Sequence, residues 1–192
     1  MARWRTMSNA MSGVTTVSVP AQQSALVPPP RERIRALKRH LIESLRDLRK
    51  ARHPDRLIQR PSAELEGFAA EVVREGCTQC QGHCCRGGGE PAYLDERTMA
   101  RVRRDAPSLD AAGIIALYTQ SIASPGYEGS CLFHGAQGCT LHKSLRAELC
   151  SQYYCTGLWD FMKLRPAPDK VEIVASRGGV TRRSAITSAS GT

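Results

Sequence analysis

Aromatic residues are scarce in this sequence: Phe, Tyr and Trp together make up 5% of its 192 residues. The apolar core must therefore rest mainly on Leu, Ile, Val and Ala, and small cores of this kind often depend on a covalent or metal cross-link. The sequence also lacks the apolar run of about 20 residues that a membrane-spanning helix requires. These absences predict one small domain without a membrane span.

The N-terminus lacks a secretory signal, because no continuous apolar segment follows Arg3 and Arg5. We therefore expect a cytoplasmic protein. Persistent disulfides are rare in the reducing cytosol, where clustered thiols more often bind metal. The eight cysteines of the chain are accordingly interpreted as metal ligands, with disulfide or thiol-redox use as the alternative.

Sequence motifs of the common enzyme classes are missing as well. The sequence shows no Ser–His–Asp order, no paired-carboxylate motif and no nucleotide-binding fingerprint. Residues 87–89 are three glycines, but neither the Lys-Ser/Thr pair nor the preceding strand of a phosphate-binding loop is present. We interpret them as a flexible loop, and any catalysis would have to come from a metal centre.

Positive charge is abundant but confined to one part of the chain. The net charge is +9, and residues 1–60 account for all of it, with 13 Lys/Arg against 4 Asp/Glu. Within this part, residues 31–52 place apolar side chains at spacings of three and four, which predicts an amphipathic helix with a basic outer surface. The simplest interpretation packs this helix on the domain with its cations in solvent. Contact with nucleic acid, a membrane surface or an acidic protein is the alternative.

The rest of the chain predicts a mainly α, small and irregular helical domain with disordered termini. Helices are expected before Gly76, after Asp95 as N-cap, and over residues 108–122, with a short strand at 170–174. The predicted organisation has four parts: a disordered arm at 1–30, a basic helix and linker at 31–60, a cysteine-cluster domain at 61–165, and a loose tail at 166–192.

The cysteines fall into two groups of four along the sequence. The first group is Cys77, Cys80, Cys84 and Cys85, and the second is Cys131, Cys139, Cys150 and Cys155. A C-x2-C turn lets two thiolates converge on one ion about 2.3 Å away, and further thiolates complete a tetrahedral zinc site or hold an iron–sulfur cluster. The sequence leaves open one centre with spare ligands or two four-thiolate centres. His83, His134 and His142 are expected to surround the ligands.

The first group, within "CTQCQGHCC", and the second, within "CLFHGAQGCTLHKSLRAELC", resemble the YkgJ-like family of zinc- or iron-chelating cysteine-cluster proteins. The segment "EPAYLDERTMARV" adds to this resemblance, which covers roughly residues 65–158. The chain has His142 where the family has Tyr, and Arg146-Ala147 where the family has Arg-Pro. Cys155 is less typical of the family than the other cysteines. The resemblance implies metal binding, with His142 as either a packing substitute or an extra ligand.

The sequence therefore predicts a metal-binding protein that holds zinc or an iron–sulfur cluster through clustered thiolates. One alternative is an iron–sulfur-dependent component of a redox or group-transfer enzyme. The other is an interaction module whose basic helix at 31–52 binds an acidic protein or nucleic acid.

Overall fold

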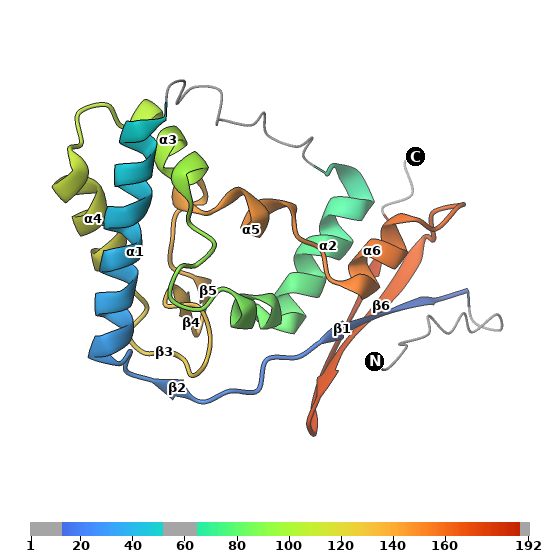
Figure 1. Ribbon diagram of the computed structural model, residues 1–192. Helices are drawn as coiled ribbons and strands as arrows, with labels where there is room; N and C mark the ends of the chain where they lie inside the picture. Colours follow the sequence, from blue (N-terminus) through green and yellow to red (C-terminus); the bar gives the residue numbers. More distant parts are fainter. Residues whose placement is uncertain (1–12, 52–64, 189–192) are drawn as a thin grey trace. The chain divides into compact units, whose positions relative to one another are not determined.

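The computed structural model describes residues 13–51 and 65–188 (Figure 1). Helices make up 45% of these residues and strands 18%, so helix predominates, as expected, but two small sheets accompany it. No helix in this part of the chain is both long and apolar enough to cross a membrane. The chain divides into two compact units: unit 1 comprises described residues 13–23, 65–83 and 154–188, and unit 2 comprises 24–51 and 84–153.

Unit 1 is a three-stranded sheet with helices packed on it. Its elements are β1 (Thr15–Pro20), α2 (Gly67–Cys80), α6 (Thr156–Met162), β6 (Lys170–Arg177) and β7 (Val180–Thr187). The strand order is β1-β6-β7, with β1 parallel and β7 antiparallel to β6 (Figure 1). The core of this unit lies between the sheet and both helices, and it includes Val17, Val19, Val72, Leu158, Phe161, Val171 and Ile173.

The sheet of unit 1 corrects two predictions about the chain ends. Disorder over residues 1–30 is wrong for β1, in which Val17 and Val19 are 1% and 3% exposed. A loose tail over 166–192 is wrong for the hairpin formed by β6 and β7. Parallel pairing joins segments far apart in the sequence, so local composition does not reveal it. Residues 1–12 and 189–192 lie outside the described residues.

Unit 2 surrounds a helical core with short strands and turns. Its elements are β2 (Leu26–Val27), α1 (Arg31–Lys50), η2 (His83–Gly87, starting at the last residue of unit 1), α3 (Glu96–Asp105), α4 (Ala111–Gln120), β3 (Gly126–Tyr127), β4 (His134–Gly135), β5 (Gly138–Cys139), η3 (Lys143–Leu145) and α5 (Glu148–Gln152). Helices α1, α3 and α4 lie side by side around an apolar core (Figure 1). The strands β2-β3-β4-β5 form the second sheet.

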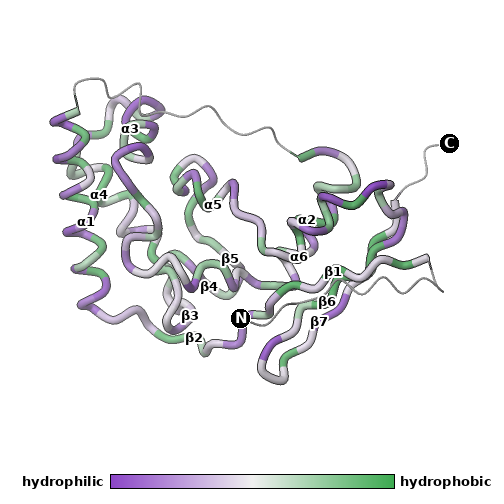
Figure 2. Tube along the Cα trace, turned by 45° about the vertical axis from the view of Figure 1, so that its right-hand side comes forward, coloured by the Kyte–Doolittle hydropathy of each residue, from purple (hydrophilic) through white to green (hydrophobic). Residues whose placement is uncertain are grey.

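Helix α1 confirms the predicted amphipathic pattern and shows what its apolar stripe does. Leu37, Leu41, Leu45 and Leu48 are buried in the core of unit 2, and hydrophobic and hydrophilic residues alternate along the helix (Figure 2). The opposite surface exposes the cations Arg31, Arg35, Lys38, Arg39, Arg46, Arg49 and Lys50. The helix is thus part of the fold. An acidic partner or nucleic acid on its outer surface rests on charge alone and stays a prediction.

The helix boundaries follow the caps in one case and not in another. Helix α3 begins after Asp95, whose side chain accepts a hydrogen bond from the Thr98 amide at 2.9 Å, as predicted. Helix α2 continues past Gly76 to Cys80 and ends at Gln81, which has a left-handed backbone with φ of 51°. A Cβ on Gly76 would lie 2.7 Å from Leu158 Cδ2, so this glycine permits close packing and does not terminate the helix.

Candidate metal centre

The structure groups the cysteines differently from their order in the sequence. Unit 1 contains Cys77, Cys80 and Cys155, and unit 2 contains Cys84, Cys85, Cys131, Cys139 and Cys150. The boundary between the units falls inside the first cysteine motif, after His83. The two sequence groups of four therefore do not correspond to two structural groups.

The five cysteines of unit 2, called here the thiol cluster, come from four segments of the chain. Cys84 and Cys85 lie on η2, Cys131 lies in the loop before β4, Cys139 ends β5, and Cys150 lies on α5. Their charges act on one another: Cys139 raises the pKa of Cys85, Cys131 and Cys150, and Cys84 raises that of Cys150. All five are free thiols, so the fold collects unpaired sulfur atoms in one place.

The adjacent pair on η2 turns toward the same cluster. A hydrogen bond between the two thiols lowers the pKa of Cys84 to about 7. The same bond, together with burial and the charges of Cys84, Cys131 and Cys139, raises the pKa of Cys85. Neighbouring side chains diverge in a regular helix or strand. The tight turn of η2 is what allows both thiols to face one centre.

Burial separates the remaining thiols into two kinds. Burial is the main cause that raises the pKa of Cys131 to about 12, and it also raises the pKa of Cys150. Cys84 and Cys150 are nevertheless exposed to solvent, whereas Cys85, Cys131 and Cys139 are partly buried. The cluster is therefore anchored in the protein and open to solvent at one side.

Glycines 87 and 88 bring η2 close to Cys131. A Cβ on Gly88 would lie 3.2 Å from Cys131 Cβ and 3.3 Å from the Cys85 carbonyl oxygen. A Cβ on Gly87 would lie 2.4 Å from the Tyr93 hydroxyl. The sequence analysis interpreted these glycines as a flexible loop. Their structural role is close approach, because any side chain would push the cysteine-bearing loops apart.

Backbone hydrogen bonds hold the loops that carry the thiols. The Cys131 amide donates to the Cys85 carbonyl at 2.9 Å, and the Gly88 amide donates to the same carbonyl at 3.1 Å. Strands β4 and β5 pair His134 with Cys139. Three of the five thiols are thereby fixed to one another through the main chain.

The histidines near the cysteines have protein partners, as expected for residues that surround the ligands. His134 is 1% exposed, its Nδ1 lies 2.8 Å from Ser130 Oγ, and its ring contacts Tyr127. Nδ1 of His142 accepts a hydrogen bond from the Ser144 amide and so caps η3. In unit 1, Arg177 approaches the ring of His83 at 2.6 Å. The capping role of His142 favours the packing interpretation over an extra ligand.

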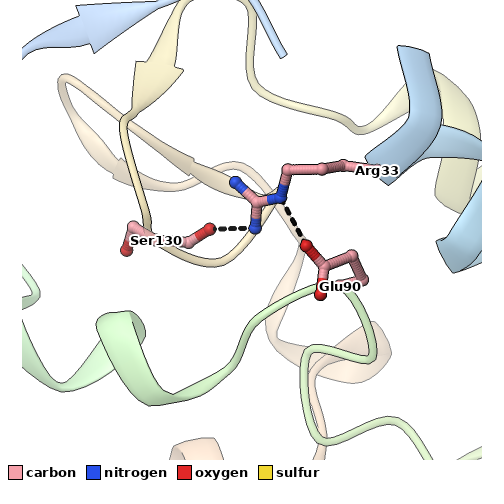
Figure 3. Close-up of polar contacts among 3 residues, drawn as sticks. All are labelled: Arg33, Glu90 and Ser130. Atoms are coloured by element: carbon pink, nitrogen blue, oxygen red, sulfur yellow. Dashed lines mark hydrogen bonds and ion pairs between the residues drawn. The ribbon is translucent and has the colours of Figure 1, made fainter. Parts of the chain in front are cut away.

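Two arginines beside the thiol cluster were not among the sequence-predicted site residues. Arg33 on α1 donates from Nε to Glu90 Oε1 and from Nη2 to the Ser130 carbonyl, each at 2.6 Å (Figure 3). Arg146 donates from Nε to the Leu141 carbonyl at 3.0 Å. A signal existed for Arg33, since it stands four residues before Leu37 on the buried side of α1, where a cation needs partners.

The thiol cluster fits a metal centre in ligand type and number. Among residues 13–51 and 65–188, no three His, Cys, Asp or Glu side chains are already placed as a group that could hold an ion. Zinc and iron–sulfur clusters each need four thiolates, and the cluster offers five thiols. Because a thiol must lose its proton to bind metal, ligand geometry would form together with binding.

Comparisons of the chain with protein-family models, curated proteins and solved structures give no match. The resemblance to the YkgJ-like family therefore rests on the cysteine motifs and stays a prediction.

Proposed function

We propose that unit 2 is a metal-binding domain that holds zinc or an iron–sulfur cluster through its thiol cluster. The observation that carries this proposal is the collection of five thiols from four separate segments into one mutually interacting group. Thiolates are soft ligands that suit both zinc and iron–sulfur centres. The proposal narrows the eight sequence candidates to Cys84, Cys85, Cys131, Cys139 and Cys150.

The chief competing interpretation treats these cysteines as inert core residues. Free cysteines that serve only packing behave as small apolar residues and are among the most buried residue types. Cys84 and Cys150 are instead exposed to solvent, and the pKa of Cys84 is lowered to about 7. A group of thiols with exposed members and one readily ionised sulfur is better suited to binding metal.

Cobalt titration tests the proposal directly. Reduced, metal-free protein is titrated with Co²⁺ under anaerobic conditions while the sulfur-to-cobalt charge-transfer absorption is recorded. We expect this absorption to saturate at about one Co²⁺ per chain, since four thiolates complete one tetrahedral site. Protein whose thiols have been alkylated serves as the control and should show no such band. Absence of the band from unmodified, folded protein would contradict metal binding by the thiol cluster.

A further inference from the structure

Arg33 connects the two loops that carry Cys85 and Cys131. Its guanidinium lies between Glu90, which follows Cys85 in the chain, and the Ser130 carbonyl, which directly precedes Cys131 (Figure 3). The side chain of Arg33 is 20% exposed, so this ion pair is partly shielded from solvent. The main chain links the same loops through the hydrogen bond from Cys131 to Cys85. Arg33 thus adds a second connection that fixes their separation.

Arg146 plays the corresponding part on the other side of the thiol cluster. Besides the Leu141 carbonyl, it contacts the Cys139 carbonyl at 3.4 Å through Nη2. Arg101 on α3 in turn donates to the carbonyls of Ser144 and Arg146. This set of contacts ties the segment between Cys139 and Cys150 to the helical core.

Both arginines also place positive charge beside thiols that would become thiolates. Arg33 acts to lower the pKa of Cys131, and Arg146 acts to lower that of Cys150, each against a larger effect of burial. Zinc with four thiolates carries a net charge of about −2, which two guanidinium groups would neutralise. A partly buried anionic centre needs such compensation, because burying unbalanced charge is costly.

From these contacts we infer that Arg33 and Arg146 are positioning residues for the metal centre: they hold the thiol-bearing loops in place and offset the charge of the bound thiolates. This inference rests on the proposed function of the thiol cluster. It assigns α1 a role in metal binding, although α1 contributes no ligand.

The test compares Arg33→Met and Arg146→Met with Arg33→Lys and Arg146→Lys in Co²⁺ titrations of the full chain. Residues that orient metal ligands typically change metal affinity 10- to 100-fold when mutated, so we expect the Met variants to bind Co²⁺ about 10- to 100-fold more weakly. The cobalt absorption spectrum should shift, because ligand geometry changes. Lys keeps the charge but not the two-pronged donor geometry, so its variants should fall between Met and wild type.

Arg35→Met is the matched control, because Arg35 lies on the same helix and is exposed. It should bind Co²⁺ as wild type does. Folded Met variants with wild-type affinity and spectrum would overturn the inference. If a Met variant does not fold by circular dichroism, the Lys variant decides: weaker binding with a shifted spectrum supports the inference, and unchanged binding overturns it. Failure of the wild type itself to bind Co²⁺ would instead contradict the proposed function.

Discussion

Replacing Cys131 and Cys139 together by serine should abolish metal binding, whereas replacing Cys77 and Cys155 together should leave it intact. The thiol cluster contains five cysteines, so the first double variant retains three, fewer than a four-thiolate site requires. Structural zinc sites have apparent binding free energies of about 10–16 kcal/mol. Losing two of four ligands should therefore weaken binding by more than about 1,000-fold.

The two double variants form a matched pair because each removes two thiols, one pair from each unit. Metal per chain after anaerobic purification and Co²⁺ affinity are the measurements. Cys139 is the best single target, since its charge acts on three of the other four thiols of the cluster. Loss of metal from the Cys77/Cys155 variant would show that the assignment to unit 2 is wrong.

Leu41→Ala should destabilise the protein by about 2–5 kcal/mol, the usual cost of removing a fully buried leucine side chain. Leu41 is 0% exposed and packs in the core of unit 2. Ile42, the next residue on α1, is 38% exposed and provides the control. Ile42→Ala should cost less than about 1 kcal/mol, because little apolar surface is lost to solvent.

Urea unfolding followed by circular dichroism measures both variants. A large effect at Leu41 alone would show that α1 belongs to the core that supports the thiol cluster. Equal and small effects at both positions would indicate instead that α1 is a separate module, as the alternative from sequence had it. Surface variants such as Arg35→Met are then the proper way to examine partners of the basic surface, because deleting the helix would remove the core.

Local patterns in the sequence predicted several helices correctly, since their causes are local. The spacing of Leu37, Leu41 and Leu45 gave the buried stripe of α1, and Asp95 gave the start of α3. Gly76 misled the prediction for α2, because a glycine required by the nearby Leu158 side chain resembles a glycine that ends a helix. Close packing by a distant segment leaves no signal in the local sequence.

The grouping of the cysteines and the strands near the chain ends could not be predicted for a related reason. The pairing of β1 with β6 joins opposite ends of the chain, and Cys85 meets Cys131 through a long-range backbone hydrogen bond. The sequence supplied the residue type and the expectation of metal binding. The membership of the thiol cluster depends on tertiary contacts, as does the involvement of Arg33.

The most direct test of the account is the amount of metal and acid-labile sulfide per chain in protein purified anaerobically, read together with its absorption spectrum. The account predicts bound metal that depends on the thiol cluster: either about one zinc without sulfide, or iron with matching sulfide and visible absorption. The second result would also make redox chemistry the next question. Folded protein with reduced thiols and neither metal would contradict the central claim.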